Sequence, residues 1–381
     1  MNSAATQTVA PAASEAAEAP ASLPPAPTAS PSRPPPADLM AGAHPPGRRS
    51  PKELLAASKD FQAENRVRSW LHFAETWLVF GALMVVLSGA LAPLHPLLAS
   101  PLLRAPVAIF EGLVIVRLFI LYHDFMHLSF LRGSSVAKWI MYAYGIYVLT
   151  PPVAWRQSHN YHHAHTAKIV GSHVGSYLMV TTDMWRAMSA SERRMYKILR
   201  HPLTIFFAYF TVFGLGMGLS PFRRNPSKNW DSLLAVVVHV VANPLIFWFF
   251  GWDVWLFAWF LPLFVGMMAG AYLFYAQHNF PEMVVQPRES WEYTRAALES
   301  SSYMKTGALL GWLTGDIGYH HVHHLNPGIP FYRLKEAMAG IPELQQPLGT
   351  TSLAPSDIAA CFRQKLWDAE QGKMVGYPSG T

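Results

Sequence analysis

Three histidine clusters constrain the fold of this chain more than any other feature of its sequence. In two of them the histidines stand at i, i+3 and i+4, a spacing that puts three imidazoles on one face of a helix. The remaining cluster has the spacing i, i+4. The members are, in chain order, His123 and His127; His159, His162 and His163; and His320, His323 and His324. Because a metal ion is held by several side chains at once, these clusters predict a metal site at which all three meet.

The composition indicates a membrane protein. The chain is 51% hydrophobic and 14% charged, whereas soluble domains are about 25% charged. Its net charge of +6 is spread over several segments, which favours a membrane-surface and topology signal over nucleic-acid binding. The single cysteine, Cys361, excludes a disulfide framework and an iron–sulfur or rubredoxin-type centre carried by one chain.

Four apolar stretches are predicted to cross the membrane as helices, because a helix satisfies its own backbone groups within lipid. They cover, approximately, residues 71–94, 107–122, 233–250 and 255–275. The second stretch contains Glu111, for which the sequence offers no partner, and Arg117, which is close enough to the end to extend to the interface. Val136–Leu149 is short for a span, and we expect it to be interfacial or re-entrant.

The stretch Leu203–Leu219 is also apolar, but we expect it to lie at the interface and not to cross. Basic residues flank it at 193–200 and at 223–228, and such residues favour the cytoplasmic face. An even number of crossings between the second and third clusters is also required if all the clusters are to meet on one side. The turn 251–254 contains no Lys or Arg, so it is expected to be the outward tip of a hairpin.

Together these predictions describe an all-α integral membrane protein. Four transmembrane helices form two hairpins, and interfacial helices and a cytoplasmic helical cap hold a histidine-rich di-metal site. Residues 1–50, which are rich in Ala and Pro and show no signal peptide, are expected to be a disordered tail. Residues 51–345 are expected to form the membrane-bound domain and residues 346–381 a cytoplasmic tail. Short helices are expected at Tyr332–Met338 and Asp357–Gln371.

The clusters contain twice the four ligands of a closed zinc site, so two metal ions are predicted. Imidazole suits Fe, Zn, Cu and Ni, and the residues alone leave iron and zinc open. His278, at the end of the last span, is a ninth candidate ligand. His173 and His239 are expected to play no part in the metal site; His239 lies within a predicted span, where it is expected to face the bundle and pack there with a hydrogen bond. Asp124 and Asp316 are expected to orient imidazoles by accepting a hydrogen bond from the second ring nitrogen. His165 and His321 are expected either to support the ligands in a similar way or to face solvent.

The chemistry at such a site depends on the metal. Zinc would support hydrolysis of a polar substrate. Iron with O2 would support attack on an unactivated methylene C–H bond, which lies beyond side-chain acid–base catalysis, and a site among spanning helices favours a lipid-like substrate. A metal-binding or transport protein without redox chemistry is a further alternative. Transporter ligands, however, lie near the membrane midplane, whereas these clusters stand at or beyond the ends of the spans.

The clusters resemble the three histidine boxes of the membrane-bound fatty acid desaturase family: HxxxH, then HxxHH, then HxxHH or QxxHH. Their order and their placement beside paired hairpins agree, and the resemblance covers roughly residues 65–345. Trp155-Arg156 before the second box, and Gly318-Tyr319 with Leu325 and Asn326 around the third, are similar to the acyl-lipid, or omega-6 (Δ12-type), branch. Met126 departs from the pattern, because many members carry a small residue just before the last histidine of the first box.

The resemblance implies a non-haem di-iron enzyme that uses O2 and two electrons to place a double bond in an acyl chain. It also implies a further ligand beside the last span, at His278. The substrate would be an acyl lipid, acyl-CoA or acyl carrier protein. Lipid hydroxylases and carotenoid ketolases or hydroxylases carry similar boxes, so they remain alternatives.

The electrons are expected to come from a separate protein, because no dinucleotide-binding pattern is evident in this sequence. A ferredoxin, a rubredoxin or a cytochrome b5-type protein would fit this role. The active site is expected on the cytoplasmic face, and the membrane is expected to be a bacterial cytoplasmic membrane.

Overall fold

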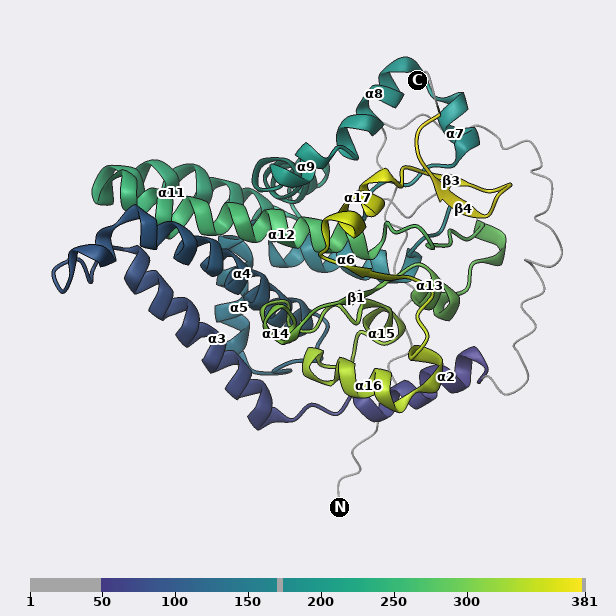
Figure 1. Cartoon of the computed structure of the whole chain (residues 1–381), viewed down its shortest axis with the longest axis horizontal. Coiled ribbons are helices and arrows are strands. Elements are labelled where there is room, and N and C mark those ends of the chain that lie inside the picture. The colour runs from purple at the N-terminus through teal and green to yellow at the C-terminus, as the bar shows by residue number, and fades with distance from the viewer. Residues whose placement is uncertain (1–48, 170–173, 379–381) are drawn as a thin grey trace. The chain divides into compact units, whose positions relative to one another are not determined.

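The computed structural model describes residues 49–169 and 174–378, and within them the chain is mainly helical (Figure 1). The predicted N-terminal tail, apart from its last two residues, and His173 lie outside these ranges. The helices that precede the predicted spans or connect them are α2 (Pro51–Ser58), η1 (Lys59–Phe61), η2 (Pro96–Ala99), α6 (Pro152–His165), α7 (Thr182–Ala187) and α8 (Ala190–Leu199).

The first two long helices, α3 (Arg66–Leu87) and α4 (Pro101–Met126), pack side by side after a turn that contains η2 (Figure 1). The Asn65 side chain caps α3 by accepting a hydrogen bond from the Arg68 N–H, so the helix begins before the predicted stretch; it also ends earlier, at Leu87. Ser100 caps α4, and Pro101 occupies its first turn. Proline is tolerated there because a backbone N–H in the first turn would have no partner within the helix. α4 therefore extends the predicted span at both ends.

Among the residues that the structure describes, three helical segments are long and apolar enough to cross a membrane: α3, α4 and the 48-residue stretch Trp230–Gln277. The last consists of α11 (Trp230–Val254), the π-helical η4 (Trp255–Phe260) and α12 (Leu261–Gln277). Gly251 interrupts it, because its φ of 82° and ψ of 174° lie in a region open only to glycine. The chain reverses its direction near this residue, and α11 packs against η4 (Figure 1).

The two stretches predicted to be interfacial, 136–149 and 203–219, form helices, and neither of them is among these candidate spans. α5 (Ser135–Tyr147) covers the first; the second contains α9 (Pro202–Phe206) and the π-helical η3 (Tyr209–Leu219), followed by α10 (Ser220–Arg224). His239 of α11 joins both regions, since its Nδ1 lies 2.9 Å from the Tyr209 hydroxyl and its Nε2 lies 2.9 Å from the Tyr147 carbonyl oxygen. This is the packing role that the sequence predicted for His239.

Two ionisable residues lie inside α4. Arg117 is 2% exposed; its Nε donates to the Thr76 hydroxyl at 3.0 Å, and its guanidinium lies over the Trp312 ring at 4.2 Å. The expectation that Arg117 extends to the interface is therefore wrong, because Thr76 of α3 and the ring of Trp312 hold its guanidinium in a buried position. Glu111 is fully buried, and neither of its carboxylate oxygens has a hydrogen-bond partner in the part of the chain that the structure describes.

Short elements follow α12 and surround the third histidine cluster. They are η5 (Arg288–Ser290), α13 (Tyr293–Glu299), β1 (Tyr303–Lys305), α14 (Ala308–Leu313), α15 (His320–Leu325), η6 (Phe331–Arg333), α16 (Leu334–Gly340), η7 (Pro342–Leu344), β2 (Thr350–Ser352), α17 (Pro355–Arg363), β3 (Leu366–Asp368) and β4 (Lys373–Val375). β1 and β2 pair in parallel, and β3 and β4 pair antiparallel. The all-α prediction is wrong in this detail, and the helix predicted to reach Gln371 ends at Arg363.

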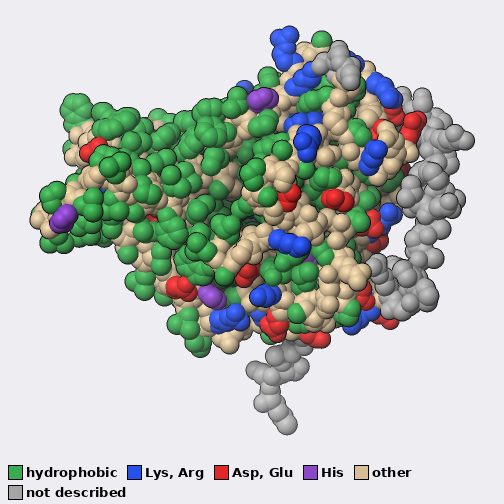
Figure 2. Space-filling model, viewed as in Figure 1, with side chains coloured by type: hydrophobic (Ala, Val, Ile, Leu, Met, Phe, Trp, Pro, Cys, Tyr) green, Lys and Arg blue, Asp and Glu red, His purple; other side chains and the backbone are tan. Residues whose placement is uncertain are grey.

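Hydrophobic side chains cover the face formed by α11 and the α3–α4 hairpin, whereas charged side chains gather over the short C-terminal elements (Figure 2). On α11 the most exposed of these apolar residues include Trp248 at 82%, Phe249 at 72% and Phe250 at 67%. So large an apolar surface would be unfavourable in water, but it is the kind of surface that contact with lipid requires. The chain is therefore a membrane protein, with its three histidine clusters at the opposite end of the long helices from this α11 tip.

Candidate metal centre

The central histidine cluster lies on α6, and a carboxylate from another helix fixes the start of this helix. Pro151 at the N-cap makes no side-chain cap, but the Asp231 carboxylate of α11 accepts a hydrogen bond from the Val153 N–H at 2.7 Å. A carboxylate at this position offsets the partial positive charge of the helix start. The helical spacing then brings three buried histidines to one side of α6: His159, His162 and His163.

Three further elements bring the other candidate ligands. His123 lies in the last turn of α4, and His127 is its C-cap residue. His278 directly follows α12. The third cluster lies on α15, every residue of which is buried. The site therefore depends on how the long helices end, because both α4 and α12 deliver histidines at the same place.

The nine candidate ligands meet in two adjoining groups. Within each group, one ring nitrogen from every histidine lies within 4.8 Å of the others. The first group is His123, His127, His159, His163 and His323, and the second is His162, His278 and His324. His320 adjoins the second group, since its Nε2 lies 2.8 Å from the Nε2 of His278. The structure thus brings together all nine histidines that the sequence singled out.

The spacing of the ring nitrogens fits metal ions. The Nε2 of His163 lies 3.1 Å from the Nε2 atoms of both His159 and His323. In the second group, the Nε2 of His162 lies 3.1 Å from that of His278. Two ligands at right angles, each about 2.1 Å from a metal ion, stand about 3 Å apart. A neutral imidazole has a single N–H, so hydrogen bonds alone would leave part of this convergence unsatisfied.

Burial keeps the imidazoles in the neutral form that binds metal. It lowers the pKa of His278 to about 4. Burial, followed by the charge of His278, holds the pKa of His162 well below its ordinary range. Burial, followed by the charge of His324, does the same to the pKa of His163. At neutral pH each of these rings can therefore offer a nitrogen lone pair.

Asp124 holds a ligand in place. Its Oδ1 lies 2.9 Å from the Nδ1 of His123, and its Oδ2 accepts a hydrogen bond from the Phe331 N–H at 2.6 Å. A carboxylate on the second ring nitrogen fixes the orientation of an imidazole and leaves Nε2 free for a metal. The segment after the third cluster is thereby tied to the first cluster.

The other three residues expected to orient imidazoles are placed differently. His165 stacks on Tyr161, with its Nδ1 2.9 Å from the Tyr161 carbonyl oxygen. His321 is buried, with its Nε2 3.0 Å from the Leu344 carbonyl oxygen. No hydrogen bond from Asp316 to a candidate ligand occurs within residues 49–169 and 174–378, so its orienting role stays a prediction.

Some residues that support the site were missed from the sequence. The Thr166 hydroxyl donates to the His162 carbonyl oxygen at 2.7 Å and lies 3.3 Å from the Nδ1 of His324. The Tyr293 hydroxyl donates to the His324 carbonyl oxygen at 2.6 Å. Thr166 could have been found, because it follows His162 by one helical turn. Tyr293 gave no such signal, since only the fold brings it to the third cluster.

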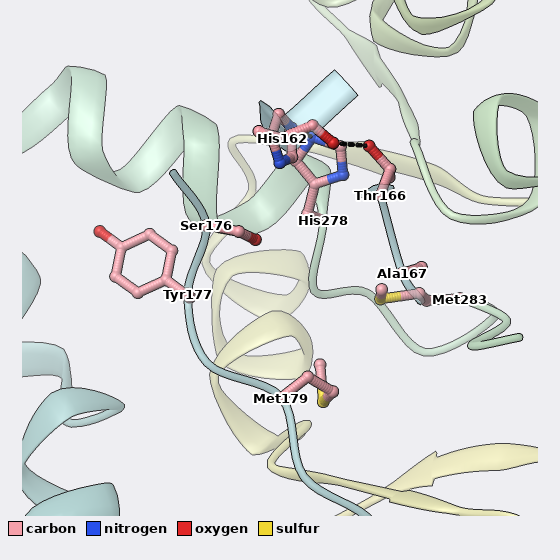
Figure 3. A pocket seen from close by; sticks show the side chains of 8 residues that line it. All are labelled: His162, Thr166, Ala167, Ser176, Tyr177, Met179, His278 and Met283. Carbon is pink, nitrogen blue, oxygen red and sulfur yellow. Dashed lines mark hydrogen bonds between the residues drawn. The ribbon is translucent and has the colours of Figure 1, made fainter. Parts of the chain in front are cut away.

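A small pocket opens beside the second group (Figure 3). It holds room for about one water molecule. Its wall consists of His162, Thr166, Ala167, Ser176, Tyr177, Met179, His278 and Met283. His162 and His278 are the two candidate ligands in this wall, whereas no member of the first group lines it. A small molecule in the pocket would therefore meet the second group.

The comparison with protein families decides what this arrangement represents. The model of the fatty acid desaturase family matches residues 99–351, which include all nine candidate ligands. The chain belongs to the fatty acid desaturase family. It is accordingly an enzyme, an oxidoreductase that acts on acyl chains, and its two histidine groups are able to bind metal ions.

Individual relatives of this desaturase support the assignment. It is 32% identical to a fatty acid desaturase of Bacillus subtilis over 73% of this chain and 78% of that protein. It is 25% identical to an sn-1 oleoyl-lipid 12-desaturase of Picosynechococcus over 66% and 71% of the two chains. It is 26% identical to an sn-1 acyl-lipid omega-3 desaturase (ferredoxin) of Nostoc over 73% and 76%.

Proposed function

We propose that this desaturase binds two iron ions in its two histidine groups and uses O2 to place a double bond in the acyl chain of a membrane lipid. The observation that supports this most is the convergence of nine histidine side chains as two adjoining groups at the ends of apolar helices. An all-nitrogen donor set without thiolate suits iron, whose bound form would supply the oxidising power to break a methylene C–H bond.

The chain's own residues hold and shape this centre. The first group has five histidines within reach and Asp124 to orient one of them. The second group borders the pocket in Figure 3, so we assign O2, a molecule small enough for this pocket, to that side. Ala167, Met179 and Met283 give the pocket an apolar wall beside the imidazoles of His162 and His278.

The reaction must balance in electrons. A –CH2–CH2– unit with O2, two electrons and two protons gives –CH=CH– and two water molecules. The substrate supplies two of the four electrons that O2 requires, and the other two come from outside. We propose a separate one-electron carrier as the donor, such as a ferredoxin, a rubredoxin or a cytochrome b5-type protein; the Nostoc relative has ferredoxin in its name.

The names of some relatives support a proposal for the substrate and for the position of the double bond. Three cyanobacterial relatives are named sn-1 oleoyl-lipid 12-desaturases, at 23–25% identity. We propose a lipid-bound acyl chain and a Δ12-type, or omega-6, position for this enzyme. The large exposed apolar surface of α11 supports a substrate that is drawn from the bilayer.

We propose four crossings in two hairpins, α3 with α4 and α11 with η4–α12, and an active site on the cytoplasmic face of a bacterial membrane. The reversal at Gly251 supports two crossings within the stretch 230–277. The basic residues on both sides of α9 and η3 support the cytoplasmic placement of these helices. All three clusters then lie on one side.

Lipid analysis of a host that expresses the chain tests this function. We expect a new unsaturated acyl species, with one more double bond than its precursor and at the Δ12 position. His162→Ala and His323→Ala should abolish it, while His173→Ala, which changes a histidine of none of the three clusters, should leave it unchanged. A hydroxylated acyl chain as the new product would contradict desaturation and favour the lipid hydroxylase alternative.

A further inference from the structure

The segment before the first span packs against the segment that follows the third histidine cluster. Leu54 of α2 is buried in the same hydrophobic core cluster as Leu325 and Ile341. Phe61 of η1 lies against Gly340, where an added Cβ would come within 2.6 Å of the Phe61 ring. No side chain larger than glycine fits this contact unless the ring moves.

Asn326, two residues after His324, is the centre of the polar contacts between these segments. Its Nδ2 donates to the Ser58 hydroxyl at 2.8 Å. Its Oδ1 accepts from the Gln62 Nε2 at 2.7 Å and from the Gly328 N–H at 3.1 Å. Ser58 and Asn326 are both buried. Both ends of the Asn326 amide are therefore satisfied by the N-terminal segment.

Further contacts extend along the same interface. The Arg333 guanidinium donates to the carbonyl oxygens of Asp60 and Ala63, at 3.4 and 3.2 Å. The Tyr332 hydroxyl accepts from the Asn65 N–H at 3.0 Å. Through these contacts residues 50–65 hold the segment that runs from α15 through η6 to α16.

The segment held by residues 50–65 contacts the metal centre at Phe331, and Leu344 of η7, which follows this segment, contacts α15. Phe331, beside Tyr332, donates its N–H to Asp124, which in turn faces His123. The Leu344 carbonyl oxygen lies 3.0 Å from the Nε2 of His321 within α15. A shift of this segment would therefore move the third cluster and also release the partner that orients His123.

We propose that residues 50–65 form a clamp that fixes the third histidine cluster for metal binding, with Ser58 and Gln62 as its positioning residues. This inference rests on the metal site proposed above. The family match begins at residue 99, so the clamp lies outside the part of the chain that the family model describes. Neither residue touches a metal-facing nitrogen; both act through Asn326.

The test measures how fast a chelator removes iron from the purified full-length enzyme. Ser58→Ala removes the acceptor for Asn326, and Gln62→Leu removes the donor with little change in volume. We expect each to release iron about fivefold faster than wild type, the effect of about one hydrogen bond. Gln62→Lys restores a donor toward the Asn326 oxygen and should return the rate to that of wild type.

A matched control is Lys52→Ala with Lys59→Ala, because both lysines are exposed on the same segment. Iron release from this variant should equal that of wild type. Equal release from wild type and Gln62→Leu would overturn the clamp, as would Gln62→Lys releasing iron as fast as Gln62→Leu. A wild-type chain that binds no metal would overturn the metal site itself, which separates the two failures.

Discussion

Asp124 is the side chain on which two parts of the metal centre depend. One carboxylate oxygen faces His123 and the other accepts the Phe331 N–H. Asp124→Asn keeps the shape but leaves one strong acceptor where there were two. We expect the affinity for iron to fall about 10- to 100-fold, as for other partners of metal-bound histidines, measured by competition with a chelator. Asp183→Asn, on the exposed surface of α7, should leave the affinity unchanged, and an unchanged affinity in Asp124→Asn would contradict this role.

Cys361 shows how burial sets the chemistry of a single residue. Burial, followed by the nearby charge of Asp357, raises the pKa of the Cys361 thiol to about 12. The thiolate is the reactive form, so at pH 8 the thiol should stay protonated and should not be alkylated in the folded enzyme. Mass spectrometry after maleimide treatment should find no adduct in native protein and one adduct after denaturation. An adduct at pH 8 in native protein would show that the thiol is accessible and ionised.

The spacing of the histidines made most of the site predictable from the sequence. His159, His162 and His163 fall on one face of α6 because the local helix is regular. Tyr293 and Asn326 could not be found in this way, because their partners are chosen by the packing of distant segments.

At the scale of elements, Gly251 marks where the stretch 230–277 reverses. Only glycine adopts its backbone conformation without strain. We expect a tag in the turn 251–254 to be reachable from outside the cell, and a tag at Arg223–Arg224 to be reachable only from the cytoplasm. Labelling of intact cells and of inverted vesicles measures both. An externally reachable tag at Arg223–Arg224 would break the four-span arrangement and split the histidines across the membrane.

The long helices were predictable because they are apolar over many turns, while their ends were not. Caps from Asn65 and Ser100 set where α3 and α4 begin. The helix predicted for Asp357–Gln371 failed at its second half, since residues 366–368 pair with 373–375 instead. Trp367 also donates its N–H to the Val180 carbonyl oxygen. Such pairing is a tertiary choice that local helical pattern does not reveal.

At the scale of the whole molecule, basic residues of two distant segments come together. The Tyr196 hydroxyl of α8 donates to the Lys365 carbonyl oxygen at 2.6 Å, which joins residues 193–200 to residues 363–373. Lys and Arg side chains are prominent in this region of the surface (Figure 2). Small electron carriers are often acidic, so this basic surface is where we expect the donor to dock.

Turnover with a separate donor should therefore weaken as salt rises, because salt screens attraction between exposed charges. The measurement is reconstitution of purified enzyme with acyl lipid, O2, NAD(P)H, a donor and its reductase over a range of ionic strength. Arg193→Ser with Arg194→Ser should flatten the dependence, whereas Arg223→Ser with Arg224→Ser, on α10, serves as the matched pair of cations elsewhere. Full turnover without any donor would contradict the need for a carrier, and turnover indifferent to salt would contradict the steering.

The metal content of the purified enzyme tests the central claim most directly. Two histidine groups that each hold one iron ion predict about two Fe per chain and little Zn after expression in iron-replete medium. His162→Ala and His323→Ala should each lower the iron content and the activity together, because each variant removes a candidate ligand from one of the two groups. A content near one Zn per chain, with no iron, would contradict a two-iron centre and with it the oxidative mechanism.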